Sequence, residues 1–315
     1  MDKRKLGRSA LAVAPLCFGG NVFGWTADEP TSFALLDVFV GAGFDFIDTA
    51  DVYSRWVPGH QGGESETIIG NWLKSRGARS KVVIATKVGM DMGHGGKGLK
   101  AAHIRASAER SLKRLQTDHI DLYYSHQDDP DTPLEETLQA HADLLRAGKV
   151  VVIGASNYSA TRLREAVDTS EQLGLPRYEV LQPEYNLYAR SGYEAELEAV
   201  CRKAGIGVAP YYSLASGFLT GKYRSEADYG KSPRGKRMAA YLNDRGRRIL
   251  AALDEAAQAN RATPAQVAIA WLMARPGLTA PVASATSVEQ LGELMAAARL
   301  ELDAATIARL DQASA

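Results

Sequence analysis

The sequence is poor in cysteine, balanced in charge and without long apolar runs, and each absence excludes a class of protein. Its two cysteines, Cys17 and Cys201, match no metal-binding or redox spacing, so we expect buried, reduced thiols and a cytoplasmic location. Lys and Arg total 37, as do Asp and Glu, which argues against nucleic acid as a partner because phosphate binding requires a basic surplus. No apolar run approaches the ~20 residues that span a bilayer, so we expect no membrane association.

Linkers, low-complexity tracts and shifts in composition are missing too. The content of charged residues, 23%, and of apolar residues, 45%, is typical of a folded globular protein. A length of 315 residues would allow two domains, but without a boundary signal we expect residues 1–315 to form one. The apolar stretch 9–17 is short and interrupted by Pro15, so we interpret it as the approach to a strand rather than a secretory signal.

Short runs rich in Val, Ile, Leu and Tyr alternate with segments of helical period along the chain. Most are continuous rather than alternating in polarity, as in parallel strands covered on both faces. The expected strands are 15–20, 44–50, 81–89, 120–127, 150–157, 178–185, 206–214 and 279–285. The expected helices include 101–116, 133–147, which opens with Thr132 as cap and Pro133 as first helical residue, 194–203 and 264–274.

Eight strands with helices between them predict an α/β protein with a single (β/α)8 TIM barrel. A doubly wound dinucleotide-binding sheet is the alternative, but it requires a G-x-G-x-x-G turn after the first strand, and the segment 18–24 reads FGGNVFG. The stretch 217–235, rich in Gly, Ser, Arg and Lys, predicts a long loop after the seventh strand. Extra helices are expected at the C-terminal end.

Polar side chains recur where the predicted strands end, which is where barrels carry their chemistry. Asp48, Lys87 and His126 end the second, third and fourth strands and are spaced 39 residues apart, one strand–helix unit per step. Tyr53 lies five residues beyond Asp48. Singly, each has an ordinary explanation, a helix cap, a solvated lysine or a structural histidine such as His141; together they favour a functional site.

These four residue types suit proton transfer to a carbonyl compound. A tyrosine has a pKa of about 10, which a neighbouring ammonium would lower by stabilising the phenolate. A carboxylate beside that lysine would keep the lysine charged, and a histidine could polarise a carbonyl oxygen. None of the four supplies hydride, so carbonyl reduction would require a nicotinamide cofactor.

An ordered series of motifs resembles the aldo-keto reductase superfamily over nearly the whole chain. The motifs are 46–53 (FIDTADVY), 63–66 (GESE), 85–87 (ATK), 121–126 (DLYYSH), 148–150 (GKV), 154–158 (GASNY), 182–186 (QPEYN) and 217–223 (GFLTGKY). The resemblance implies a barrel that binds NADPH without a Rossmann fold. It also implies Tyr53 as proton donor, Lys87 and Asp48 as the residues that tune it, and His126 as the residue that orients the substrate carbonyl.

The resemblance further implies a set of cofactor contacts. The carboxamide would meet Ser156, Asn157 and Gln182, and Tyr211 would stack on the nicotinamide ring. The other expected contacts are Gly20, Asn21, Asp48, Tyr212, Ser213, Leu214, Ser216, Lys222, Arg234, Ser284, Thr286, Gln290 and Glu293, with Arg234 at the 2′-phosphate and Arg237 as its competitor. Residues 284–287 lack the arginine common in relatives, and Leu294 replaces a usual asparagine, so NADPH is expected while NADH stays possible.

The substrate is expected to be a small carbonyl compound or alcohol, with Trp25 and Trp56 lining the mouth of its pocket. No metal is expected, since Asp91 and His94 offer only two possible ligands. Two other functions stay open. One is a Schiff-base lyase with Lys87 as nucleophile; the other is a cofactor-binding, redox-sensing regulatory subunit, by resemblance to potassium-channel β subunits, against which His126 argues. The sequence leaves open whether the chain is a monomer or a homo-oligomer.

Overall fold

A sheet of eight parallel strands forms the centre of the computed structural model, which describes residues 2–93 and 96–315. The strands follow one another around the sheet in the order β10-β3-β4-β5-β6-β7-β8-β9. Their bounds are β3 Cys17–Gly19, β4 Phe46–Asp48, β5 Val83–Val88, β6 Ile120–Ser125, β7 Val150–Ser156, β8 Val180–Gln182, β9 Gly207–Val208 and β10 Val282–Ala283. Each predicted strand range contains one of them, so the prediction of eight parallel strands is confirmed.

The sheet curls until its two edges meet. The backbone N–H of Thr279 donates to the carbonyl of Val208 at 2.7 Å, and that of Val282 donates to the carbonyl of Pro210 at 2.9 Å. These bonds connect β9 to the segment that enters β10. The fold is therefore a (β/α)8 barrel of the TIM type, as the sequence predicted.

Alternate residues of each strand point into the barrel, and small or branched apolar side chains fill its lower part. This inner cluster includes Cys17, Phe46, Ala85, Leu122 and Val180, all fully buried. A short antiparallel hairpin that the sequence did not predict, β1 Arg4–Lys5 and β2 Ala12–Val13, contributes buried side chains to the same cluster. The hairpin thereby covers the N-terminal end of the barrel. The polar side chains lie at the other end, where the strands terminate.

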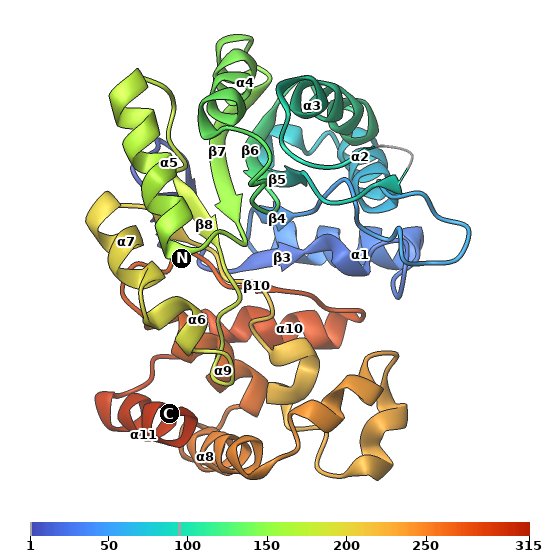
Figure 1. The fold of residues 1–315 in the computed structure, drawn as a ribbon. Helices are drawn as coiled ribbons and strands as arrows, with labels where there is room; N and C mark the ends of the chain where they lie inside the picture. The colour runs from blue at the N-terminus through green and yellow to red at the C-terminus, as the bar shows by residue number, and fades with distance from the viewer. Residues whose placement is uncertain (1, 94–95) are drawn as a thin grey trace.

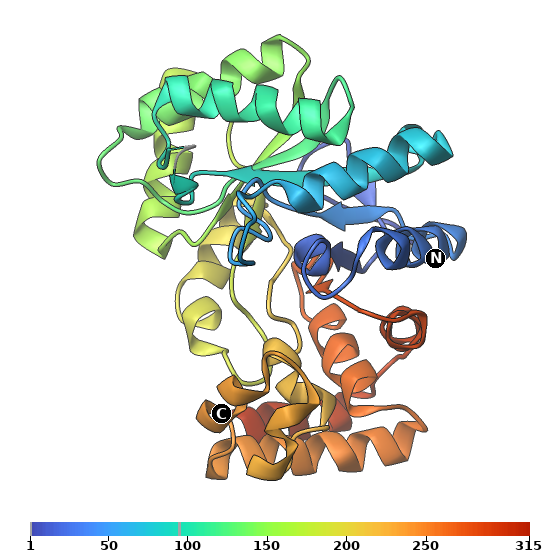
Figure 2. The same ribbon diagram turned by 90° about the vertical axis from the view of Figure 1, so that its right-hand side faces the viewer.

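The helices surround the sheet, and their apolar faces form a second, outer core with the outward-pointing strand residues. They are α1 Glu29–Gly41, α2 Glu64–Arg76, α3 Ala101–Leu115, α4 Leu134–Arg146, α5 Ala160–Leu173, α6 Ser191–Glu194, α7 Leu197–Ala204, α8 Asp244–Asn260, α9 Pro264–Met273, α10 Val288–Ala297 and α11 Ala304–Ser314. Figures 1 and 2 show the N-terminal half, blue to green, on one side of the molecule and the C-terminal half, yellow to red, on the other.

Two helix predictions need correction. Thr132 does not cap α4, because its hydroxyl donates to Asp129 Oδ2 at 2.7 Å, and Pro133 occupies the cap position without a side-chain hydrogen bond. The predicted helix 194–203 is divided into α6 and α7, since Glu196 at φ −138° interrupts the helical backbone. The segment 217–235 is largely wound into the 3-10 turns η4 Ala215–Thr220 and η5 Glu226–Lys231, followed by η6 Gly235–Ala240.

No helix in the ranges 2–93 and 96–315 is long and apolar enough to cross a bilayer.

Candidate active site

Asp48, Tyr53 and Lys87 form a compact hydrogen-bonded group at the C-terminal end of the barrel. Lys87 Nζ donates to Asp48 Oδ2 at 2.6 Å, to the Thr49 carbonyl at 2.7 Å and to the Tyr53 hydroxyl at 3.0 Å. The Tyr53 hydroxyl in turn donates to Asp48 Oδ2 at 3.3 Å. The structure thus brings together three of the four residues that the spacing predicted, and all three N–H donors of the ammonium are occupied.

The alternation of the strands explains this meeting. Phe46 and Asp48 point inward from β4, as do Ala85 and Lys87 from β5, so the polar side chains lie one layer above the apolar ones. Lys87 and Asp48 are completely buried, with side-chain exposures of 0% and 2%. Their opposite charges compensate each other in a place that water does not reach.

Burial changes the pKa expectations for this group. Loss of hydration lowers the pKa of Lys87, and the Asp48 carboxylate opposes that shift. For Tyr53, burial and then the negative charge of Asp48 raise the pKa well above its usual value. This rise is opposite to the lowering of the Tyr53 pKa that was expected from the neighbouring ammonium. The phenol therefore retains its proton at neutral pH.

His126 completes the set from the end of β6. Its ring centroid lies 6.0 Å from that of Tyr53, and the residue is 6% exposed. Burial, followed by the charge of Lys87, lowers its pKa well below the usual value, so the imidazole is neutral. Its buried Nδ1 has no hydrogen-bond partner among the described residues. A proton on Nδ1 would be a buried unpaired N–H, so the proton is favoured on Nε2.

An aromatic wall leads from the surface to Tyr53. The ring of Trp56 lies 6.1 Å from that of Tyr53 and 5.6 Å from that of Trp25, both edge to face. Trp56 is 48% exposed. The guanidinium of Arg234 lies 5.0 Å above the Trp25 ring, and burial lowers its pKa. The structure therefore brings Arg234 to the mouth of the site, while Arg237 is exposed.

Four of the predicted carboxamide and ring contacts form one polar cluster beside the group. Asn157 Nδ2 donates to the His126 carbonyl at 2.8 Å and to Ser156 Oγ at 3.2 Å, and its Oδ1 accepts from the Tyr211 hydroxyl at 2.8 Å. Ser156 Oγ donates to the carbonyl of Gln182 at 2.8 Å. Asn157 has a φ of 56°, a conformation that asparagine tolerates better than most residues.

The segment after β9 has an unusual backbone. Leu214 has φ −107° and ψ 20°, and Ala215 after it has a φ of 47°. The N–H of Ala215 donates to the Tyr212 carbonyl at 2.6 Å, and that of Gly217 donates to the Leu214 carbonyl at 2.9 Å. Tyr212, Ser216 and Gly217 also have positive φ. Lys222 follows on the same loop. Strained backbone at several neighbouring positions is typical of a functional site.

The remaining predicted contacts are distributed around the rim. Ser284 Oγ donates to Asn21 Oδ1 at 2.6 Å, and a Cβ on Gly19 would lie 2.6 Å from that same oxygen of Ser284. Gly20 has somewhat more room, because its Cβ would approach the Asp48 carbonyl to 3.0 Å. The Ser213 hydroxyl donates to the Val282 carbonyl at 2.8 Å, so it connects β9 to β10.

On α10, Gln290 Oε1 accepts from the N–H of Thr286 at 3.0 Å and from its hydroxyl at 3.1 Å. Glu293 is exposed on the same helix, and Leu294, which replaces the asparagine of relatives, is buried in the outer core. Thr286 and Gln290 therefore support each other at the start of α10.

Sequence reasoning missed two contacts that shape the group. Gln182 Nε2 donates to Asp48 Oδ1 at 2.9 Å, and Tyr124 lies beneath, with its ring centroid 5.9 Å from Lys87 Nζ. Both residues are polar and lie near the end of a predicted strand, so the alternation of the strand could have predicted that they point inward. The distance between Gln182 and Asp48 across the barrel could not be predicted in that way.

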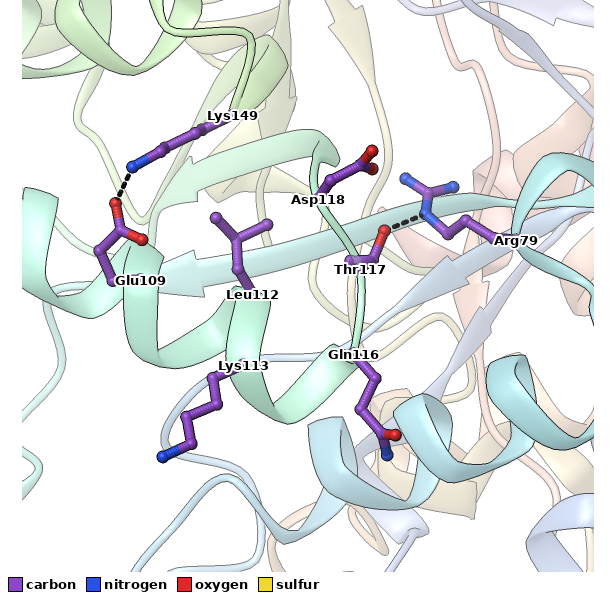
Figure 3. Close-up of a pocket in the computed structure, with 8 residues that line it drawn as sticks. All are labelled: Arg79, Glu109, Leu112, Lys113, Gln116, Thr117, Asp118 and Lys149. Carbon is purple, nitrogen blue, oxygen red and sulfur yellow. Dashed lines mark hydrogen bonds and ion pairs between the residues drawn. The ribbon is translucent and has the colours of Figure 1, made fainter.

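Other surface features lie away from this group. An open groove beside the C-terminal end of α3 is lined by Arg79, Glu109, Leu112, Lys113, Gln116, Thr117, Asp118 and Lys149, with Glu109 and Lys149 paired across it (Figure 3). A second, near β1, is lined by Arg4, Tyr193 and Cys201 among others. His94 lies outside the described residues; within them, no group of three or more His, Cys, Asp or Glu could hold a metal ion.

Comparison with known proteins gives a consistent result over nearly the whole chain. A model described as the aldo/keto reductase family matches residues 15–315. An uncharacterized oxidoreductase, YrpG, of Bacillus subtilis is 38% identical over 312 residues, covering 96% of this chain and 93% of its own. A probable voltage-gated potassium channel subunit beta of Arabidopsis thaliana is 35% identical, covering 94% and 91%. Norsolorinic acid reductase of Emericella nidulans is 34% identical, covering 90% and 73%.

Proposed function

Because this chain belongs to the aldo/keto reductase family, we propose that it reduces an aldehyde or ketone to an alcohol, reversibly, with Tyr53 as proton donor and NADPH as hydride source. The observation that carries the proposal is the Tyr53 hydroxyl. It is held between Lys87 and Asp48 at the end of an aromatic wall and beside a neutral His126.

The residues at the rim fit a nicotinamide dinucleotide. The side-chain oxygens of Ser156, Asn157 and Gln182 offer acceptors for the N–H groups of a carboxamide, beside the ring of Tyr211. The positive-φ backbone at Ala215 and Ser216, with Lys222 on the same loop, would face the pyrophosphate. Thr286, Gln290 and Glu293 would face the adenine side, and Arg234 would take the 2′-phosphate. When bound, the cofactor would supply hydride to the carbonyl carbon.

The chain's own residues then control the proton. The neutral His126, protonated on Nε2, would donate a hydrogen bond to the carbonyl oxygen and orient it toward Tyr53. As negative charge develops on that oxygen, the Tyr53 hydroxyl would release its long 3.3 Å bond to Asp48 and give up its proton. A raised phenol pKa does not prevent this, because an alkoxide is a stronger base than a phenolate. Lys87, 3.0 Å from the phenol oxygen, would stabilise the phenolate left behind.

The aromatic wall supports a planar or apolar substrate. Trp25 and Trp56 present ring surfaces along the approach to Tyr53, and such surfaces favour flat carbonyl compounds. One relative is named for the reduction of norsolorinic acid.

The two alternatives are less well supported. A Schiff-base lysine needs a free amine, whereas all three donors of Lys87 are engaged. A regulatory subunit is suggested by the relatives described as potassium channel β subunits, and slow turnover of every aldehyde together with tight NADPH binding would favour it.

The test is the Tyr53→Phe variant. Turnover of an aromatic aldehyde is measured from the loss of NADPH absorbance. We expect it to fall by about 10²-fold or more, because the proton donor is removed. The affinity for NADPH, measured from the quenching of tryptophan fluorescence, should be nearly unchanged. Wild-type turnover in the variant would remove Tyr53 from the mechanism.

A further inference from the structure

Gln182 makes a hydrogen bond across the interior of the barrel. It is the last residue of β8, the residue is 2% exposed, and its Nε2 donates to Asp48 Oδ1 at 2.9 Å. β8 and β4 are separated by β5, β6 and β7 in the sheet, so this bond joins opposite sides of the barrel. A carboxylate only accepts hydrogen bonds, so the amide nitrogen, and not the amide oxygen, must face Asp48.

The two oxygens of Asp48 have different partners. Oδ2 receives Lys87 and Tyr53, whereas Oδ1 receives Gln182 alone among the residues that the structure describes. A buried carboxylate oxygen without a donor is unfavourable, and a donor on one oxygen fixes the plane of the whole group. Gln182 therefore sets the direction in which Oδ2 faces the ammonium and the phenol.

The surroundings offer no ready substitute for Gln182. The nearby Tyr124 hydroxyl is buried; burial and then the charge of Asp48 raise its pKa, and a hydrogen bond with the Gln182 side chain opposes that rise. The Tyr124 ring is confined by Gly154, where a Cβ would lie 2.5 Å from the ring. The phenol cannot swing to replace the lost donor without displacing β7.

We propose that Gln182 is a positioning residue, which holds Asp48 so that the Asp48–Lys87 pair keeps Tyr53 in place for proton transfer. The proposal rests on the function proposed above. Gln182 was also expected at the cofactor carboxamide, and the two roles are compatible. Its Oε1, to which no described residue donates, is left for the carboxamide. One side chain would then join the cofactor amide to the carboxylate that supports the proton donor.

The first experiment measures the link in the cofactor-free chain. Urea unfolding is compared for wild type, Gln182→Met, Asp48→Asn and the double variant, since Met has the length of Gln but no donor. If Gln182 acts on Asp48, the loss of stability in the double variant should be smaller than the sum of the losses in the two single variants. The difference should be about tenfold or more in the equilibrium constant for unfolding. Because no cofactor is present, this result stands even if the wild type reduces no carbonyl compound, which would overturn the proposed function alone.

The matched control is Asn157→Gly, which removes another amide of the same polar cluster at a position whose positive φ suits glycine. Asn157 contacts His126, Ser156 and Tyr211 but not Asp48. Its effect on unfolding should add to that of Asp48→Asn within about twofold. In kinetics it should weaken cofactor binding, whereas Gln182→Met should lower kcat at saturating cofactor by about tenfold.

A second variant covers the case in which Asp48→Asn does not fold. Gln182→Glu introduces a carboxyl group next to Asp48, and two such groups share a proton as the pH falls. Once protonated, the introduced carboxyl can donate to Asp48 Oδ1, so kcat should recover toward wild type at acidic pH. Gln182→Met should show no such recovery. Additive unfolding effects, an unchanged kcat in Gln182→Met, or a pH-independent defect in Gln182→Glu would each overturn the proposal.

Discussion

The buried pair of Asp48 and Lys87 gives a quantitative prediction for stability. The two side chains are 2.6 Å apart with exposures of 2% and 0%, so removing one charge leaves the other unpaired in a dry interior. Such a change costs about 3–5 kcal/mol of unfolding free energy, whereas removing both charges together is often close to neutral. Each single variant, Asp48→Asn or Lys87→Met, should therefore be far less stable than the double variant.

The two single variants should not be equal. In Asp48→Asn the ammonium keeps only neutral acceptors, which are the new amide oxygen, the Thr49 carbonyl at 2.7 Å and the Tyr53 hydroxyl at 3.0 Å. In Lys87→Met the carboxylate keeps two donors, Gln182 at 2.9 Å and Tyr53 at 3.3 Å. Hydrogen bonds to a charged group contribute about 1.5–3 kcal/mol each, so we expect Lys87→Met near 3 kcal/mol and Asp48→Asn nearer 5 kcal/mol.

The pH dependence has a defined sign. Burial lowers the pKa of Lys87 relative to the unfolded chain, so its folded form loses the proton first as the pH rises. Without Asp48 this shift is larger. The destabilisation by Asp48→Asn should therefore shrink with increasing pH, as the stranded ammonium becomes neutral.

The assay is urea unfolding of the cofactor-free protein, monitored both by far-ultraviolet circular dichroism and by tryptophan fluorescence. Coincident curves are required for a two-state free energy. The control is Glu109→Gln, which breaks the exposed pair with Lys149 in the groove of Figure 3 and should cost less than about 1 kcal/mol. A double variant as unstable as the two single effects together, or an Asp48→Asn variant within about 1 kcal/mol of wild type, would contradict this prediction.

Three further predictions concern single side chains. Burial and Glu66 raise the pKa of Asp51 to about 8, so the folded state binds a proton that the unfolded chain loses at lower pH, and the wild type is destabilised as the pH rises from about 4 to about 8. Over that range the unfolding free energy of Asp51→Asn should rise relative to wild type by up to a few kcal/mol in urea unfolding. A difference between the two proteins that does not change with pH would contradict this. Gly154→Ala would place its Cβ 2.5 Å from the Tyr124 ring and should destabilise by about 1–3 kcal/mol in the same assay; an unchanged midpoint would show that the ring can move. Arg234→Leu should reduce the preference for NADPH over NADH by about tenfold in kcat/KM, and an unchanged ratio would remove Arg234 from the 2′-phosphate.

Much of the site could be predicted from the sequence because a barrel strand has a simple geometry. Side chains alternate between inside and outside, and every parallel strand ends at the same face of the sheet. The recurrence of Asp48, Lys87 and His126 at strand ends was therefore enough to predict that they face one site. The alternation also explains why apolar runs such as 82–85 precede the polar residue.

The electrostatics of the site could not be predicted in this way. Reasoning from neighbours alone expected Lys87 to lower the pKa of Tyr53, but burial and Asp48 raise it. Desolvation depends on how completely other side chains exclude water, and pattern alone does not measure that. The position of Arg234 on the Trp25 ring is another case, since 209 residues separate the two in the chain.

The fold class, the order of the strands and the polar residues at their ends can all be predicted from the chain, because they follow from local periodicity and from the geometry of parallel strands. Which of those residues touch depends on the closed barrel. The bond from Gln182 to Asp48 crosses the closed barrel between β8 and β4, and the register that places one opposite the other is set by the closure of all eight strands. No local pattern in the chain encodes that distance.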